Sequence, residues 1–212
     1  MPCPYRYAMT YDPEEHHRRS IRLKGYDYSQ PGAYFVTVCT NKWKCLFGEI
    51  VGGTMVLNQL GQIVSGCWNE IPEHFPNVEL DEFVTMPNHL HGIVVTANKN
   101  QLSACRGTAC RAPTVESFGK PVAGSLSTIM RSFKSAVTKE INKMRGTPNL
   151  PIWQRNYYEH VLRNEDKLNR TREYVLNNPL QWQFDRENPR RIQDEAYDNQ
   201  WGHFEGIIYG KS

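Results

Sequence analysis

The chain has 212 residues, a formal net charge of +3 and an ordinary apolar content, which is typical of a folded globular protein rather than a fibrous or largely disordered one. No apolar run approaches the roughly 20 residues of a membrane span, and the N-terminus lacks a signal-peptide core, so we expect a cytoplasmic protein that does not bind a membrane. Its six cysteines contain no Cys-x-x-Cys pair, which favours reduced thiols over a disulfide framework or zinc cluster.

Hydrophobic periodicity predicts the secondary structure. The predicted elements, in chain order, are strands at 34–39 and 54–57, a helix at 58–74, strands at 78–85 and 89–95, a helix at 125–144, a strand at 153–162 and a helix from 164 to 178. Apart from the short strand at 54–57, this order is that of a ferredoxin-like split βαβ with one added helix. We therefore expect an α+β fold with helices packed on an antiparallel sheet. Such a fold hosts many functions and decides none of them.

Three segments follow from these boundaries. Residues 1–30 are a basic N-terminal arm, residues 31–180 contain the ferredoxin-like domain, and residues 181–212 form a polar C-terminal extension. Within the domain, residues 97–122 are polar and interrupted by glycine and proline. A loop of this length inside a compact domain is usually either functional or disordered.

The basic residues are distributed unevenly, although the net charge is too small to indicate nucleic acid. Basic side chains with aromatic neighbours suit phosphate contact combined with base stacking. Ordinary solvated surfaces are the alternative for each segment taken alone. The candidate DNA contacts are Arg18, Arg19, Arg22, Lys24 and Tyr26 in the arm, Arg131 and Lys134 on the predicted helix at 125–144, Arg155, and Arg170 on the last helix.

His89 and His91 are separated by one apolar residue within the sequence MPNHLHG at 86–92. Positions two apart on a strand face the same side, so a strand would bring the two imidazoles together. Imidazole is the commonest side-chain ligand of divalent metals, and two imidazoles can hold an ion while leaving positions open for a substrate. The alternative is two strand histidines with ordinary hydrogen bonds, because His-x-His also occurs by chance.

Tyr174 and Asn178 are four residues apart on the last predicted helix and therefore share one of its faces. They flank the apolar stripe that would pack on the sheet. The Tyr174 hydroxyl can thus point toward the rim of the sheet, where His89 and His91 could lie. The alternative, which helix statistics alone favour, is that Tyr174 is a boundary residue of an amphipathic helix.

Three segments together resemble the REP-associated tyrosine transposases, which belong to the single-tyrosine HUH transposase superfamily. They are residues 86–92 (MPNHLHG), 153–160 (WQRNYYEH) and 174–179 (YVLNNP), and they come in the order found in that family. The similarity covers roughly residues 18–190.

The resemblance implies the HUH endonuclease fold and a metal-dependent enzyme that cuts and rejoins single-stranded DNA beside hairpins. His89 and His91 match the two metal-binding histidines, and Tyr174 matches the nucleophile that forms a 5′-phosphotyrosine. Asn178 stands where related enzymes place a polar third ligand. The implied partner is hairpin-forming single-stranded DNA, without a nucleotide cofactor, bound by a monomer or homodimer. We expect residues 16–28 of the arm and the 97–122 loop to help read the hairpin.

Elementary chemistry agrees with these roles. Cleavage of a phosphodiester is helped by a cation that neutralises its oxygens and orients its phosphorus. Two neutral imidazoles and an amide oxygen leave the charge of the ion available, and such ligands suit Mn²⁺, or Mg²⁺ held partly by substrate oxygens and water. Tyrosine attack conserves the bond energy in a phosphotyrosine. Because a phenol has a pKa of about 10, its deprotonation needs assistance at neutral pH.

Three other functions remain open on the sequence alone. A domesticated protein could bind structured single-stranded DNA without cutting it. A replication-initiation HUH nuclease shares the chemistry but often carries a helicase domain. An RNA-binding protein with the RNA-recognition-motif topology would need paired aromatic residues on its central strands, and the chain contains no motif of that kind.

Overall fold

The computed structural model describes residues 30–97 and 122–197, which contain one four-stranded sheet and one two-stranded hairpin. The order in the large sheet is β4-β5-β1-β6, and every neighbouring pair is antiparallel. The strands are β1 (Gly32–Cys39), β4 (Val78–Thr85), β5 (His89–Thr96) and β6 (Tyr158–Leu162). Because β5 lies between β1 and β4, the predicted split βαβ arrangement and α+β fold are confirmed.

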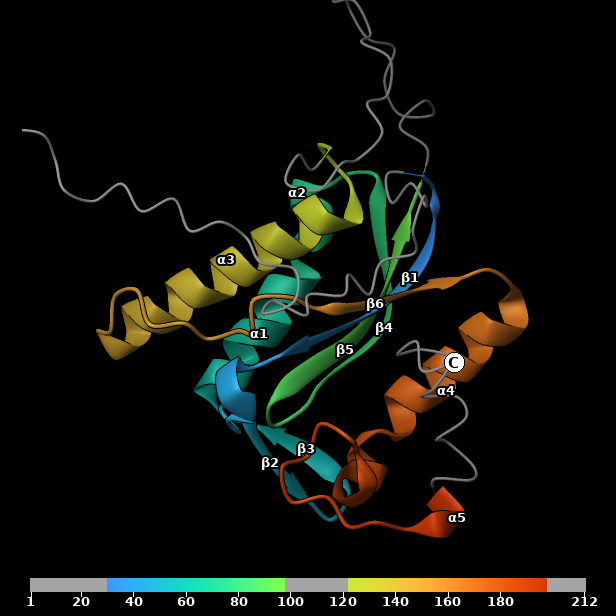
Figure 1. Cartoon of the computed structure of the whole chain (residues 1–212). Helices are drawn as coiled ribbons and strands as arrows, with labels where there is room; N and C mark the ends of the chain where they lie inside the picture. Colours follow the sequence, from blue (N-terminus) through green and yellow to red (C-terminus); the bar gives the residue numbers. More distant parts are fainter. Residues whose placement is uncertain (1–29, 98–121, 198–212) are drawn as a thin grey trace, which may run out of the picture.

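Helices cover both faces of this sheet (Figure 1). The helices are α1 (Gln59–Asn69), α2 (Ile71–His74), α3 (Leu126–Arg145) and α4 (Glu165–Asn177). The alternation of side chains along β1 divides the core in two. Tyr34, Val36 and Val38 pack with α1 and α3, whereas Phe35 packs with Tyr174 and Val175 of α4. The α4 face also carries the histidines of β5.

Local signals set where the helices begin and end. The Asn58 side chain accepts hydrogen bonds from the backbone N–H groups of Leu60 and Gly61, at 2.9 and 3.1 Å, and thereby caps α1. Asn164 caps α4 in the same way through the N–H of Lys167, at 2.9 Å. Helix α3 ends at Gly146, whose φ of 63° lies in the left-handed region that glycine adopts without strain.

The helix predicted at 58–74 and the strand predicted at 153–162 are both shorter in the structure. The helical segment divides at Glu70 into α1 and α2, because Pro72 has no N–H to continue the hydrogen-bond ladder. Strand β6 begins only at Tyr158, although Trp153 makes an isolated bridge with Thr40. Between Trp153 and Tyr158, the backbone carbonyls of residues 154–156 accept hydrogen bonds from the ammonium of Lys134 instead of pairing within the sheet.

The structure also contains a strand and two short helices that the sequence did not predict. Strand β2 (Gly48–Val51) pairs with β3 (Thr54–Leu57) through Gly52 and Gly53, which both have positive φ as a tight hairpin turn requires. After α4, a 3-10 helix over Pro179–Phe184 and the short α5 (Glu195–Tyr197) carry the chain past one end of the sheet.

None of the helices within residues 30–97 and 122–197 combines the length and the apolarity that crossing a bilayer requires.

Candidate metal centre with an adjacent tyrosine

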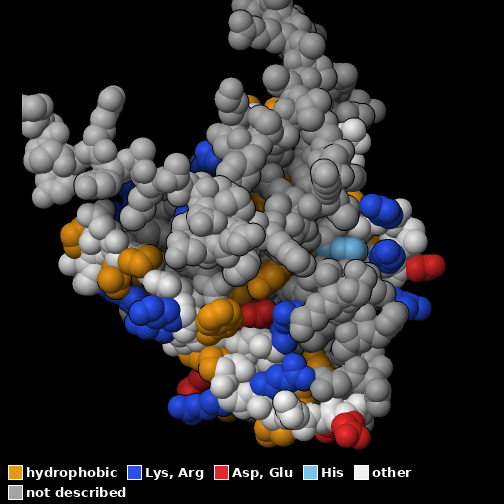
Figure 2. Space-filling model, viewed as in Figure 1, with side chains coloured by type: hydrophobic (Ala, Val, Ile, Leu, Met, Phe, Trp, Pro, Cys, Tyr) orange, Lys and Arg blue, Asp and Glu red, His pale blue; other side chains and the backbone are white. Residues whose placement is uncertain are grey.

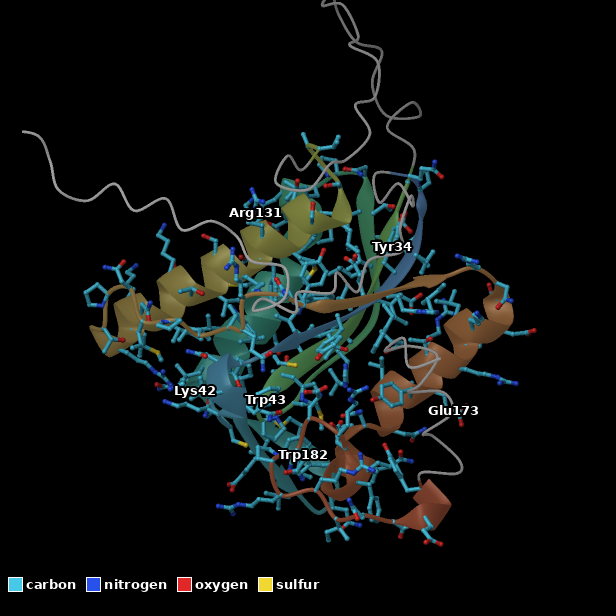
Figure 3. The ribbon with its side chains drawn as sticks, in the orientation of Figure 1. Tyr34, Lys42, Trp43, Arg131, Glu173 and Trp182 are labelled. Atoms are coloured by element: carbon cyan, nitrogen blue, oxygen red, sulfur yellow. The ribbon has the colours of Figure 1, made fainter. Side chains whose placement is uncertain are left out.

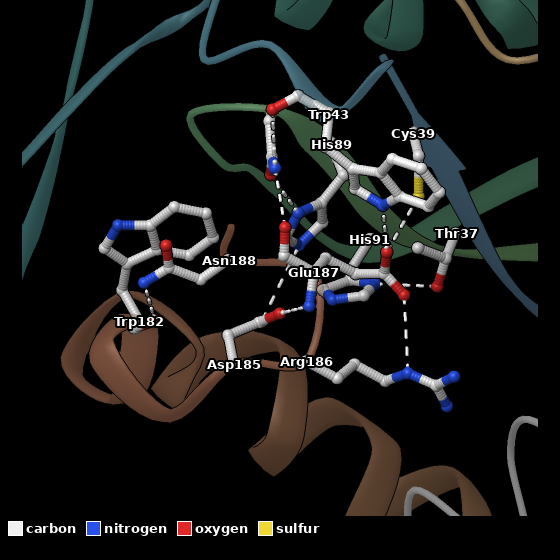
Figure 4. A network of polar contacts seen from close by, with 11 residues as sticks. Thr37, Cys39, Trp43, His89, His91, Trp182, Asp185, Arg186, Glu187 and Asn188 are labelled. Carbon is white, nitrogen blue, oxygen red and sulfur yellow. Dashed lines mark hydrogen bonds and ion pairs between the residues drawn. The ribbon is translucent and has the colours of Figure 1, made fainter. Parts of the chain in front are cut away.

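His89 and His91 face the same side of β5 and are both fully buried. Their ring centroids are 4.3 Å apart (Figure 4). In the register of the sheet, His91 stands opposite Thr37 and His89 stands opposite Cys39 on β1. The strand period of two therefore places the imidazoles side by side, as the sequence predicted.

A neighbouring side chain fixes the Nδ1 atom of each imidazole. Thr37 Oγ1 is 2.8 Å from His91 Nδ1, and Asn88 Oδ1 is 2.8 Å from His89 Nδ1. The Asn88 amide is oriented by its Nδ2, which donates to the Glu187 carbonyl at 2.7 Å. Its oxygen must therefore accept a hydrogen bond from the Nδ1–H of His89, which leaves the Nε2 of His89 as a bare lone pair.

Both Nε2 atoms are buried and have no hydrogen-bond partner among the described residues. Burial lowers the pKa of His89 to about 4 and that of His91 well below its ordinary value. Both rings are thus neutral near pH 7. A neutral imidazole whose Nδ1 is held by a hydrogen bond and whose Nε2 is free has the form in which histidine binds a metal.

Asp185 completes the set from the segment that follows the 3-10 helix. Its Oδ1 accepts the N–H of Glu187 at 2.6 Å, while its Oδ2 has no hydrogen-bond partner and lies 3.8 Å from His89 Nε2. One ligand atom from each of His89, His91 and Asp185 lies within 4.8 Å of the others, and all three residues are buried. This group could hold a divalent ion, because two imidazoles and a carboxylate are ordinary ligands of such ions.

Glu187 anchors the Asp185 segment to the end of the sheet (Figure 4). Its carboxylate accepts hydrogen bonds from the Trp43 indole at 2.8 Å and from the Cys39 thiol at 3.5 Å. Burial and the nearby Glu187 carboxylate raise the pKa of the Cys39 thiol, which therefore stays protonated and can donate. Together with the Asn88 bond to its carbonyl, these contacts hold Glu187, and Asp185 with it, beside β5.

Asn178, the predicted third ligand, lies next to Asp185. It is buried, its side chain is hydrogen-bonded to Asp185, and its Oδ1 has no hydrogen-bond partner among the described residues. Its role as a ligand stays a prediction, and Asp185 offers a potential donor that sequence reasoning missed. Asp185 belongs to the stretch interpreted as a polar extension, where a single aspartate among charged residues gives no signal.

Tyr174 lies on the α4 face that packs against the sheet and is only 2% exposed. Its ring centroid is 5.4 Å from that of His91 and 6.1 Å from that of Phe35. Asn178 follows one helical turn later. The structure therefore brings together the tyrosine and the histidines that the sequence singled out.

The predicted DNA contacts that fall within residues 30–97 and 122–197 lie on both faces of the sheet. The arm residues lie outside the described part of the chain, as does nearly all of the 97–122 loop. Arg131 is exposed on α3 (Figure 3), and Arg170 is exposed on α4, on the other face of the sheet. The Lys134 ammonium donates to three carbonyls, at 2.7 to 3.2 Å, so its donors are already used. Arg155 is exposed.

No family model matches the chain, but one curated relative does. A Haemophilus influenzae protein, described as uncharacterized, is 43% identical over 170 residues, which cover 80% of this chain and 92% of that protein. The chain belongs to the same family as this protein.

Two solved structures are also similar to the chain. One, described as a REP-associated tyrosine transposase bound to a REP hairpin, is 18% identical with a TM-score of 0.49, over 76% of this chain and 73% of that one. The other, a putative transposase from Deinococcus radiodurans, is 11% identical with a TM-score of 0.40, over 74% and 95%. At such low identity, neither assigns an activity to the chain.

The hydrogen bond from Thr37 to His91 predicts a measurable effect on metal binding. Thr37→Val keeps the buried volume but removes the partner of Nδ1, so the ring is less firmly oriented. We expect affinity for Mn²⁺ to fall by about 10- to 100-fold. Isothermal titration of the purified protein measures this change, with Thr138→Val on α3 as the control. Equal affinities for Thr37→Val and the wild type would show that Thr37 does not orient a ligand.

Acid should weaken metal binding through Asp185. Burial raises the pKa of this carboxyl to about 7, so in the metal-free protein it takes up a proton as the pH falls through 7. His89, with a pKa of about 4, stays neutral over the same range. We therefore expect Mn²⁺ affinity to be constant above pH 8 and to fall about tenfold per pH unit between 7 and 5, where one proton competes with the ion. Titrations in matched buffers test this, and a flat profile would contradict it.

Proposed function

We propose that this protein is a metal-dependent, transposase-type nuclease that cuts and rejoins single-stranded DNA beside a hairpin, with Tyr174 as the nucleophile. One observation carries the proposal. A tyrosine ring packs 5.4 Å from a histidine that belongs to a buried group of three potential ligands, and the unpaired atoms of that group converge. Core histidines and aspartates normally have their polar atoms paired, so this arrangement favours a ligand over a purely structural role.

The donor set favours one kind of ion. His89, His91 and Asp185 would hold it, and the bound ion would neutralise and orient the phosphodiester. Two imidazoles favour Mn²⁺ over Mg²⁺, because Mg²⁺ prefers oxygen ligands. The single carboxylate cancels one charge and leaves the remainder for the phosphate.

Tyr174 would then act on the phosphate next to the ligand group. Its phenol gives a proton to water and its oxygen forms a bond to phosphorus while the bond from phosphorus to the 3′ oxygen breaks. The departing 3′ oxygen takes up a proton from water, which leaves a 5′-phosphotyrosine and a free 3′ hydroxyl. A 3′ hydroxyl from another strand can reverse the step and rejoin DNA without a nucleotide cofactor. Phe35 and His91 pack against the ring and restrict its position.

A non-cleaving binder of structured single-stranded DNA is the second candidate. The near-complete burial of Tyr174 favours it, because a nucleophile must reach its substrate.

One experiment separates the two candidates. Full-length protein is incubated with a labelled hairpin oligonucleotide that carries single-stranded flanks, with Mn²⁺ or with a chelator, and covalent adducts are resolved on a denaturing gel. We expect an Mn²⁺-dependent adduct. Tight hairpin binding without any adduct would favour the binder and overturn the nuclease.

A further inference from the structure

A basic groove runs along the C-terminal half of α3, on the face of the sheet opposite α4. The chain from 146 to 155 forms its other wall, and the groove encloses about 810 Å³. Lys134, Lys139, Lys143 and Arg155 are among its lining residues, and no aspartate or glutamate lines it. Lysine and arginine side chains are also prominent on the face shown in Figure 2. A groove with four basic side chains and no carboxylate attracts an anion.

Buried polar groups without partners line the same groove. Trp153 is 7% exposed, and its indole Nε1 has no hydrogen-bond partner among the described residues. The buried Nε2 of Gln154 is likewise unpaired. Asn142 is 8% exposed and leaves one acceptor, Oδ1, unpaired. Two of these three unpaired atoms are hydrogen-bond donors and one is an acceptor, which agrees with the positive charge of the groove. Buried donors without partners are uncommon in folded proteins.

The walls of the groove are held in place before any ligand binds. Lys134 fastens the 154–156 backbone to α3 through its three carbonyl contacts. Asn142 Nδ2 donates to the Leu150 carbonyl at 2.9 Å, which ties down the other part of the wall. A preformed site loses little entropy when it binds its ligand.

The groove adjoins the end of β1 that lies beside the candidate metal centre on β5. The Gln154 N–H donates to the Cys39 carbonyl at 2.9 Å, and Cys39 stands opposite His89 in the β1–β5 register. One flexible strand that leaves the tyrosine site around this end of the sheet can therefore enter the groove. Lys139 and Lys143 follow one another along α3 at a rise of about 6 Å, which suits contact with successive phosphates of one strand.

We propose that this groove binds the sugar–phosphate backbone of the single-stranded DNA that flanks the hairpin. The inference rests on the proposed function, because that function supplies a single-stranded ligand. Trp153 is too deeply buried to stack on a base, so the groove binds phosphate and contributes affinity without reading sequence.

The test compares two double variants of the full chain that lose equal charge. Lys139→Ala/Lys143→Ala alters the groove, whereas Arg145→Ala/Arg163→Ala alters exposed positions outside it that are not candidate DNA contacts. Fluorescence anisotropy without divalent metal measures binding to a hairpin with single-stranded flanks and to the same hairpin without them. We expect the groove variant to bind the flanked hairpin at least about tenfold more weakly, with a salt slope smaller by about 1.4 for two lost phosphate contacts. The bare hairpin should bind all three proteins alike.

Three results would overturn this proposal. They are unchanged binding by the groove variant, equal losses in both double variants, and a loss that disappears when the flanks are replaced by abasic sugar–phosphate chain. The last would mean that the groove contacts bases. Because no cleavage is measured, the outcome is independent of Tyr174. If the groove variant binds the flanked hairpin more weakly but the wild type forms no covalent adduct, the proposal for the groove stands and the proposed nuclease activity is wrong.

Discussion

Tyr174→Phe will abolish the covalent DNA adduct while hairpin affinity stays unchanged. The substitution removes only the hydroxyl, and the ring keeps its packing against Phe35 and His91. Loss of a nucleophile removes the chemical step itself, so we expect adduct formation to fall by at least about 10³-fold. The measurement combines the denaturing-gel assay with anisotropy on the same hairpin.

Tyr158→Phe is the matched control for this substitution. Tyr158 pairs with Thr37 in the β1–β6 register, packs against the same apolar cluster as Tyr174, and is half-buried. Burial and the nearby Glu187 raise the pKa of its phenol, so less of the reactive phenolate is present at neutral pH. We expect this variant to form adducts at the wild-type rate. Adducts that persist in Tyr174→Phe and vanish in Tyr158→Phe would move the nucleophile to β6.

Asp185→Asn will weaken Mn²⁺ binding by more than about 100-fold, because it removes a direct ligand rather than a residue that orients one. The amide is isosteric with the carboxylate, and its oxygen can still accept the Glu187 N–H. Its nitrogen would face the lone pair of His89, where Asp185 Oδ2 now lies at 3.8 Å. A neutral amide also avoids the free-energy cost of burying a negative charge, the same cost that raises the pKa of Asp185 to about 7. The metal-free variant should therefore melt no lower than the metal-free wild type.

Calorimetric titration and thermal melting with and without Mn²⁺ separate loss of a ligand from loss of structure. Asp166→Asn, which removes an exposed carboxylate on α4, controls for the change in charge. Asn178→Ala tests the ligand predicted from the sequence. We expect about a tenfold loss, since this change removes only the hydrogen bond to Asp185. If Asn178→Ala loses as much affinity as Asp185→Asn, both residues bind the ion. Wild-type affinity in Asp185→Asn would refute the proposed donor set.

The short-range features of the site could be predicted because they depend on periodicity alone. A spacing of two on a strand is enough to place His89 and His91 on one face, and a spacing of four on a helix is enough to align Tyr174 with Asn178. The strand and helix order likewise determined the split βαβ topology. The resemblance to a known family added the expectation that these two pairs would meet, which the ring contact between His91 and Tyr174 shows.

Tertiary structure alone decided which residue completes the ligand group. Asp185 follows His89 by nearly 100 residues and reaches it because Glu187 is fastened to Trp43 and Cys39, contacts that leave no periodic trace in the sequence. The late start of β6 has a similar cause. Its residue types favour a strand from Trp153, but the half-buried Lys134 side chain binds the carbonyls of residues 154–156 through its ammonium. The periodicity of a strand or helix predicts which face a side chain occupies. Only the packing of the folded chain determines which residues that side chain contacts.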